Sequence, residues 1–498
     1  MKQRIFGMEC EYAPACHSRD DFHVHRLSGE ALLEHTKGLS ARLFSSLPLT
    51  GYARAGEFLG NGGRLYIDRG GHPEFATPEC LHITDLVAYE KAGDRIVREL
   101  AMLTNRQTTA GHRAPRLHLY KNNVDLYGHT YGGHENYLIT PRAAEEIHHI
   151  IPFLVTRQLF TGAGRILTRR ENGSPCYHIS QRAEFIDRTF SDRSTRVRGI
   201  INTRKREIYG QEENRRLHII VGDSNMSEIA IALKVGTTLL MLRVLEEGRL
   251  DGFPALPAPV DALKDISRSW RCNFQLAGRS GRYTALDVQS FYLEIVQRFF
   301  SSRRPTADEA LAMGLWEEVL CGMGRLKISG ANWKLDDDPC RLRRKIDWIY
   351  KLWLLNRYGN MEAPEVNDRR LKLMDIKYHD LDPDTGLFTR GESLGLMDRL
   401  VDDDAIEAAC RRPPENTRAR IRGAVIRKTS DKPVDVEIEN WEKINIRAQR
   451  RPNSISHPFK TYKGTVNCLM ICLEDPFKSL DPSIFERLDR FVDTWGQN

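Results

Sequence analysis

The chain has 498 residues, 41% of them hydrophobic, which is enough to bury a substantial core in one large domain with an appendage or in several smaller ones. Its 74 basic and 67 acidic residues are interspersed and leave a net charge of +7, so an acidic macromolecular partner is permitted but not required. Glu9 and Glu11 stand where a secretion signal needs an apolar run, and Lys234 and Arg243 interrupt the most apolar later stretch. We therefore expect a cytoplasmic protein with no membrane partner.

The ten cysteines are scattered and lack the paired spacing of a zinc site. We expect reduced, mostly buried thiols.

Two strands with polar faces are predicted near the N-terminus. In RIFGMECEY the apolar residues alternate with Gly7, Glu9 and Glu11, which predicts a strand with one acidic face. Residues 28–47 have helical spacing behind a potential Ser28 cap. In NGGRLYIDRGGHPEFATPEC, residues 61–80, three polar side chains alternate with leucine and isoleucine, which predicts a second strand with a polar face. These three polar residues are Arg64, Tyr66 and Asp68.

Further along the chain, residues 84–103 read as an amphipathic helix, and RLHLYKNNVD and HENYLIT read as strands. The segment RRLHIIVGDSNMSE predicts a strand that leads into a helix ending near Gly248, and helices dominate residues 285–358. This order predicts an α+β fold with a largely antiparallel sheet. Composition shifts near residues 380–420, and short strands follow, so we expect a large domain over 1–405 and a small C-terminal domain over 406–498.

The polar residues of the first strands supply only oxygen, which suits a hard cation such as Mg²⁺ better than zinc. They are Glu9, Glu11, Tyr66, Asp68, Glu74 and Glu79. Arg64 adds a fixed guanidinium of the kind that binds phosphate. Ordinary surface carboxylates with a salt-bridged arginine would give the same pattern, so both interpretations stay open at this point. His134 also has two open interpretations, as a hydrogen-bonded structural histidine or as a ligand.

Neither a P-loop nor a Rossmann glycine motif is present, so any nucleotide binds in another way. Arginine is dense over residues 192–206 and 415–428. Such runs are usually solvated surface and sometimes bind RNA, but no row of aromatic residues accompanies them. The more economical functional interpretation is an acidic protein partner, and we expect no nucleic-acid partner.

Seven long motifs together resemble the family of Pup ligases and the closely related depupylases and deamidases. They are NGGRLYIDRGGHPEFATPEC, YKNNVDLYGHTYGGHENYL, PFLVTRQLFTGAGRI, SQRAEFI, INTR, RRLHIIVGDSNMSE and ENTRARIRG, in this order along the chain. The resemblance implies a glutamine-synthetase-like large domain, whose antiparallel sheet cradles ATP and magnesium, and a small C-terminal domain.

The resemblance also implies roles for individual residues. Glu9, Tyr66 and Glu74 match magnesium ligands, Arg64, Thr77 and Trp441 match ATP contacts, and Asp68 matches the catalytic base. Further metal, phosphate or modifier contacts are expected at Glu11, His134, Arg204 and Arg216. The sequence departs from the family by an insertion around residues 450–464.

The implied activity is an ATP-dependent ligation. ATP phosphorylates the C-terminal glutamate of a small acidic Pup-like modifier, and a lysine of a target protein then forms an isopeptide bond, which marks the target for a bacterial proteasome. Deconjugation and deamidation of the same modifier are the alternative. We favour the ligase for two reasons. The link from Tyr12 to Arg64 reads largely as a helix, without the longer flexible insertion typical of the deconjugating enzymes, and the segment GDSNMSE resembles the ligases more than those enzymes. A basic scaffold or RNA-binding protein that kept the fold without the chemistry is a rival of another class.

Overall fold

The computed structural model describes residues 3–17, 29–109, 116–124, 129–168, 175–193, 197–203, 215–247, 255–272, 274–278, 281–329, 341–358, 369–448 and 468–495. Within these residues, nine strands form one sheet in the order β11-β12-β13-β8-β1-β6-β5-β4-β3. Their bounds are β1 Phe6–Glu11, β3 Arg54–Ala55, β4 Phe58–Leu59, β5 Arg64–Ile67, β6 Pro73–Ala76, β8 Gly133–Ile139, β11 Arg188–Ser191, β12 Gly199–Asn202 and β13 Arg215–Ile219. Of the neighbouring pairs, only β11 and β12 run parallel. The expected antiparallel α+β sheet is confirmed.

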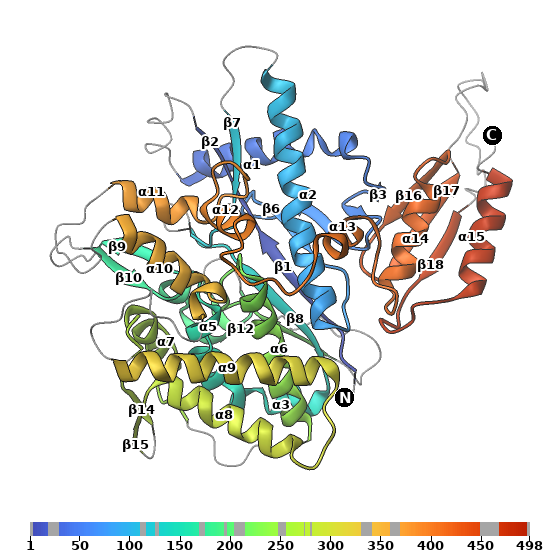
Figure 1. The fold of residues 1–498 in the computed structure, drawn as a ribbon. Coiled ribbons are helices and arrows are strands. Elements are labelled where there is room, and N and C mark those ends of the chain that lie inside the picture. The colour runs from blue at the N-terminus through green and yellow to red at the C-terminus, as the bar shows by residue number, and fades with distance from the viewer. Residues whose placement is uncertain are drawn as a thin grey trace.

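Strand β1 in the middle of the sheet has one apolar face. Phe6, Met8 and Cys10 are buried in the main hydrophobic core. Helices α2 (Ile83–Thr109) and α6 (Glu228–Glu246) contribute to the same core and contact each other (Figure 1). Because side chains alternate along a strand, the residues between the apolar ones face away from this core.

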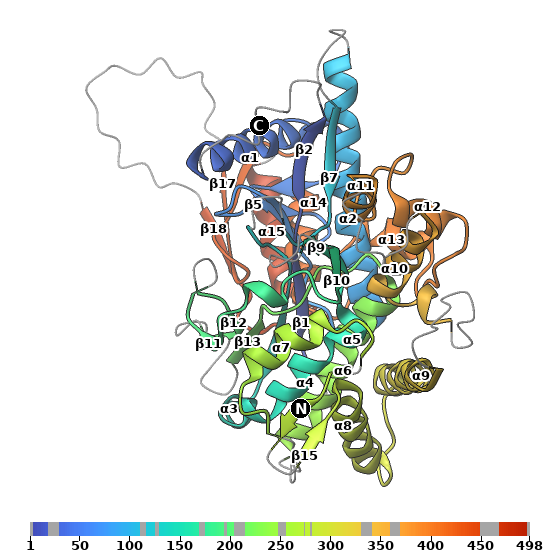
Figure 2. The ribbon, with the colours of Figure 1, turned by 90° about the vertical axis from the view of Figure 1, so that its left-hand side faces the viewer.

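Helices cover the middle of the chain, as the sequence predicts. They are α3 Pro141–Glu145, α4 Ile151–Thr156, α5 Gln158–Thr161, α7 Pro259–Arg268, α8 Ala285–Phe300, α9 Ala307–Ser329, α10 Asp347–Tyr358, α11 Arg369–Lys377, α12 Leu387–Ser393 and α13 Asp403–Arg411. The N-terminal helix α1 spans Gly29–Phe44. Strands β2 (Ala13–His17) and β7 (Arg116–Tyr120) form a separate antiparallel pair beside α2 (Figure 2). Two more short pairs join β9 Arg165–Thr168 to β10 Pro175–His178 and β14 Leu276–Gly278 to β15 Gly281–Tyr283.

A smaller α/β unit ends the described chain. Strands β16 (Val434–Ile438), β17 (Lys443–Ala448) and β18 (Cys468–Cys472) form its sheet, and α14 (Ala419–Thr429) and α15 (Pro482–Trp495) its helices. Its hydrophobic core includes residues of α14, all three strands and α15. The two-domain division remains a proposal. The expected boundary between residues 405 and 406 would fall inside α13, whose Ile406, Ala409 and Cys410 pack in the large core, so we propose to move the boundary to between Arg411 and Ile421.

Two other expectations can be compared with the structure. None of the nine cysteines among the described residues forms a disulfide bond, but only Cys10, Cys80 and Cys410 are buried, so the prediction of mostly buried thiols was wrong. Cys468 and Cys472 lie on the exposed face of β18, where strand alternation places them together. The expected insertion at 450–464 lies outside the described residues. Among the helices that the structure describes, none is both long and apolar enough to cross a membrane.

Candidate active site

Three oxygen-bearing side chains share one row across the sheet. In the antiparallel register Glu11 of β1 lies opposite Glu74 of β6, and Glu74 lies opposite Tyr66 of β5. Directly opposed residues of an antiparallel pair have Cβ atoms about 4.5–5.5 Å apart. Strand register alone therefore brings the three side chains together on the face away from the main core.

Asp68 follows β5 in the tight turn to β6. Its backbone N–H donates to the His72 carbonyl at 2.9 Å, and its carboxylate accepts the His72 N–H at 2.6 Å. These bonds fix the carboxylate beside the row. One carboxylate oxygen each of Glu11, Asp68 and Glu74 lies within 4.8 Å of the others. We call these three residues the carboxylate triad.

The triad crowds three carboxyl groups together, and for Glu11 and Glu74 the nearby positive charges do not offset this crowding and the burial. Burial, together with Glu9 and Asp68, raises the pKa of Glu74 to about 8. Burial, Glu74 and Asp68 raise the pKa of Glu11 as well, although Gly132 N–H donates to its carboxylate at 2.7 Å. A hard divalent cation would stabilise such crowded oxygens, so the donor set fits Mg²⁺.

Asp68 behaves differently from the other two triad members. Burial would raise its pKa, but the hydrogen bond and charge of His72 outweigh this and lower it. The Asp68 carboxylate therefore remains ionised at neutral pH.

Tyr66 completes the row as a neutral phenol. Burial raises its pKa, and the charges of Glu9 and Glu74 add to the effect. The Tyr66 hydroxyl therefore keeps its proton at any working pH and can offer its oxygen lone pairs to a cation.

A second cluster surrounds Glu9, which lies on β1 two residues before Glu11. Asn136 donates to its carboxylate at 3.2 Å, and the rings of His134 and His218 lie 3.5 and 3.7 Å from the carboxylate. The Arg216 guanidinium lies 3.9 Å away. Burial would raise the pKa of Glu9, but these histidines and the arginine hold it far below its usual range. Sequence reasoning missed His218, although its alternation with Arg216 in RRLHIIV places both side chains on one face of β13.

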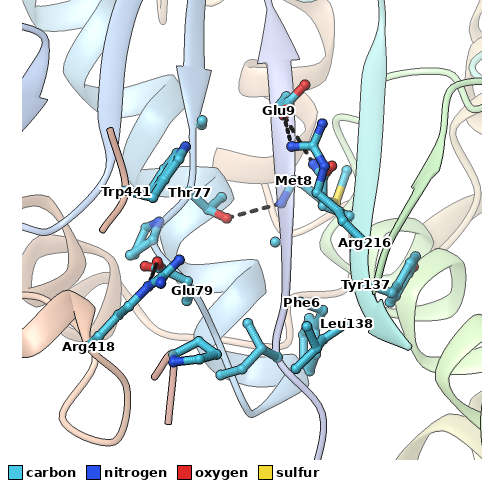
Figure 3. Close-up of a pocket in the computed structure, with 16 residues that line it drawn as sticks. Phe6, Met8, Glu9, Thr77, Glu79, Tyr137, Leu138, Arg216, Arg418 and Trp441 are labelled. Atoms are coloured by element: carbon cyan, nitrogen blue, oxygen red, sulfur yellow. Dashed lines mark hydrogen bonds and ion pairs between the residues drawn. The ribbon is translucent and has the colours of Figure 1, made fainter. Parts of the chain in front are cut away.

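A cleft that is partly open to solvent begins at Glu9 (Figure 3), and its empty volume is about 620 Å³ when the adjoining open solvent is included. The Thr77 hydroxyl in its wall accepts the Met8 N–H at 3.0 Å. Trp441 of the C-terminal unit forms another part of the wall, with its ring edge-on to Phe58 at 5.2 Å. Glu79 and Arg418 pair with each other on the side of Trp441, away from Glu9 (Figure 3). Arg216 and Asn136 lie against Glu9 at the other end. The rest of the lining is largely apolar and includes Ile5, Phe6, Met8, Ala76, Pro78, Tyr137, Leu138 and Pro476. This division suits a ligand with a flat apolar part and an anionic tail.

Among the described residues, not every expected site residue lines the cleft or joins the carboxylate triad. Arg64 pairs with Glu57 at 2.5 Å, lies 4.2 Å from the centroid of the Tyr66 ring, and is absent from the cleft lining. Glu79 points to Arg418 and Arg422 instead of joining the carboxylate triad. Arg204 lies outside the described residues.

A sheet that carries carboxylates beside a cleft with an apolar wall fits an enzyme that uses a metal-bound nucleotide. The family model of the Pup-ligase protein matches residues 4–445. The Pup–protein ligase of Acidimicrobium ferrooxidans is 37% identical over 99% of both chains, and that of Kribbella flavida is 36% identical over the same shares.

Solved structures agree with the sequence relatives. The ligase PafA in complex with the prokaryotic ubiquitin-like protein Pup superposes with a TM-score of 0.82 at 29% identity, covering 100% of this chain and 94% of that chain. The Pup ligase PafA in complex with ADP superposes with a TM-score of 0.74 at 30% identity, over 92% and 93% of the two chains. The chain therefore belongs to the Pup-ligase family, and it is a ligase. The family predicted from the sequence is confirmed, and these relatives do not favour the depupylase and deamidase alternative.

Proposed function

We propose that the protein uses ATP to join a Pup-like modifier, through its C-terminal glutamate side chain, to lysine side chains of target proteins. The observation that supports this most is the row of Glu11, Glu74 and Tyr66, with Asp68 beside it, next to the cleft. A carboxylate does not react with an amine at neutral pH until one of its oxygens becomes part of a leaving group. Phosphorylation by ATP supplies that leaving group, and the products are an isopeptide bond, ADP and phosphate.

Asp68 is proposed as the catalytic base. The attacking lysine has a reference pKa of about 10.4 and is nucleophilic only as the neutral amine. The carboxylate of Asp68, ionised and oriented by His72, would accept the proton as the amine attacks.

Glu9, Tyr66 and Glu74 are proposed as magnesium ligands, with Glu11 as a further contact. All four offer oxygen, and the raised pKa values of Glu74 and Glu11 reflect the same crowding of oxygens that a cation would stabilise. When bound, magnesium would offset charge on the transferring phosphoryl group.

The cleft is proposed to hold ATP, with the base near Trp441 and Thr77 and the phosphates toward Glu9. Arg216 and His134 stand at the phosphate end and would contact the phosphates or the modifier's carboxylate. Arg64 would reach the phosphates only by leaving Glu57. Arg204, together with the arginines of 193–206, is proposed to attract the acidic modifier.

A conjugation assay tests this function. Purified protein with ATP, magnesium, a glutamate-ending Pup and a lysine-bearing target should form conjugates and release ADP, and should leave a glutamine-ending Pup unchanged. Cleavage of preformed conjugates or deamidation without net ligation would contradict the proposal. The cytoplasmic setting and the supply of targets to a bacterial proteasome belong to the same proposal.

The rival function, a basic scaffold or RNA-binding protein, makes a different prediction. It requires RNA binding that weakens steeply with salt and no ATP turnover. ATP turnover that depends on both magnesium and Pup would exclude it.

A further inference from the structure

One acidic side chain of the large domain holds two arginines of the C-terminal unit. The Glu79 carboxylate accepts hydrogen bonds from Nε–H of Arg418 at 2.7 Å and from Nη2–H of Arg422 at 2.5 Å. The exposed fractions of the three side chains are 10%, 3% and 0%. Burial would raise the pKa of Glu79, but the two guanidinium groups outweigh it and lower the pKa to about 2. We call Glu79, Arg418 and Arg422 the Glu79 cluster.

The Glu79 cluster holds Trp441 in place. Arg422 donates to the Trp441 carbonyl at 2.9 Å, and its guanidinium carbon lies 4.8 Å from the centroid of the indole. The same guanidinium donates to the Gly62 carbonyl at 2.8 Å, next to the start of β5. One arginine therefore connects the indole to two segments of the large domain.

The rest of the C-terminal wall of the cleft depends on the same cluster. Among the lining residues, the C-terminal unit contributes Arg418, Trp441 and Pro476 (Figure 3). The backbone N–H of Arg418 donates to the Pro476 carbonyl at 3.1 Å, and its guanidinium donates to the Leu473 carbonyl at 2.8 Å. Arg418 thus pairs with Glu79 itself, and Trp441 and Pro476 each accept a hydrogen bond from an arginine that pairs with Glu79.

We propose that Glu79 is a positioning residue for the nucleotide base. Through Arg418 and Arg422 it fixes how far the wall with Trp441 stands from Thr77, which directly follows β6, and from Leu138 of β8. The distance between these two walls decides whether a flat base can contact the protein on both of its faces. The inference deepens the proposed function, on which it rests for the identity of the nucleotide.

A purely structural ion pair would behave differently. A buried pair adds little net stability, yet removing one partner leaves a buried charge unpaired, so stability falls wherever the pair lies. Only a pair that positions the wall should also weaken nucleotide binding. Because no member of the Glu79 cluster belongs to the carboxylate triad, turnover at saturating ATP should change little.

The experiment measures binding of a fluorescent ADP analogue and, separately, KM and kcat for ATP. In Glu79→Gln we expect the Kd of the analogue and the KM for ATP to rise about tenfold, with kcat within about twofold of the unaltered protein. Arg422→Lys keeps a positive charge but loses the planar fork over Trp441, so it should raise the same two constants with a smaller loss of stability.

Glu228→Gln is the matched control. Glu228 is fully buried, pairs with Arg399 at 3.3 Å and lies outside the cleft lining. Its loss should lower stability while leaving nucleotide affinity unchanged. Nucleotide affinity unchanged in a folded Glu79→Gln, or in Arg422→Lys if the first variant does not fold, would overturn the inference. A fall in kcat alone would do the same.

The binding measurement needs no turnover, so it separates this inference from the proposed function. Weakened analogue binding in the variants, in a protein that forms no conjugates, would support the inference and contradict the ligation. Conjugation by the unaltered protein, with unchanged nucleotide binding in the variants, would support the ligation and contradict the inference.

Discussion

Glu11, Glu74 and Tyr66 meet because they occupy one row of three paired strands, and Asp68 joins them because a tight turn follows β5. At the scale of single residues, the pKa values of two neighbouring carboxyl groups are shifted in opposite directions. The pKa of Glu74 is raised to about 8, whereas His72 lowers that of Asp68. Neighbouring carboxyl groups that differ in this way are suited to different roles: Glu74 to binding a cation and Asp68 to accepting a proton.

Asp68→Asn should abolish conjugation, lowering its rate by about 10²–10⁴-fold, because the amide keeps the shape and loses the base. Affinity for ADP should stay within about twofold, since Asp68 does not line the cleft. Rates of conjugate formation and nucleotide titrations check both points. Conjugation at the rate of the unaltered protein would end the assignment of the base.

Magnesium binding should release protons near pH 7. Without a cation Glu74, with its pKa of about 8, is mostly protonated at pH 7, and the proton must leave before the carboxylate can bind a metal. Magnesium affinity should therefore rise as the pH rises toward 8. Calorimetry in two buffers of different ionisation enthalpy measures the release, and Glu74→Gln should both weaken binding and release fewer protons. Heats independent of the buffer would contradict the assignment.

At the scale of elements, the sheet depends on close approach of α2 to β6. A Cβ on Gly93 of α2 would lie 2.9 Å from Cγ of Phe75 and closer still to Cδ1. The glycine therefore lets the helix lie directly over the strand that carries Glu74.

Gly93→Ala should lower the free energy of unfolding by about 1–3 kcal/mol through overpacking. Gly38→Ala on α1 is the control, because nothing lies within 4 Å of its Cβ. That change should stabilise the helix by up to about 1 kcal/mol. Denaturant unfolding compares the two variants, and equal effects would show that α2 and β6 are not in contact as described.

Much of this arrangement follows from the sequence, because strand alternation is a local property. The alternation of Arg64, Tyr66 and Asp68, and that of Glu9 and Glu11, predicts which side chains share a face. Alternation does not give the pairing partner. Glu57, which pairs with Arg64, directly precedes the neighbouring strand β4, and residue spacing gives no sign of this pairing. The roles of Thr77 and Trp441 came from resemblance to a family, not from spacing, and they remain proposals.

At the scale of the whole molecule, two hydrophobic cores meet across a polar contact. The ion pair between Glu79 and Arg422 joins residues 343 positions apart, a separation at which sequence pattern carries no information. A small third hydrophobic cluster, Ala55, Phe58 and Ile426, adds apolar contact between the edge of the sheet and α14. The cleft lies where the two units meet, so its wall cannot be predicted from either unit alone.

Acid should weaken this contact. The pKa of Glu79 falls from about 4.5 in the unfolded chain to about 2 in the folded one, so its contribution to stability is present above pH 4.5 and is lost as the pH falls toward 2. We expect Glu79→Gln to be less stable than the unaltered protein by about 3 kcal/mol at neutral pH, and less so as the pH drops below 4.5. Urea unfolding at several pH values measures the difference. A difference that stays constant with pH would contradict the ion-pair account.

The most direct test of the proposed chemistry traces oxygen. A Pup whose C-terminal glutamate carries ¹⁸O in both side-chain oxygens is conjugated with unlabelled ATP, and the released phosphate is analysed by mass spectrometry. If the carboxylate is activated by phosphorylation, each phosphate carries one ¹⁸O and the isopeptide carbonyl keeps the other. Conjugates formed together with unlabelled phosphate would contradict activation by phosphorylation.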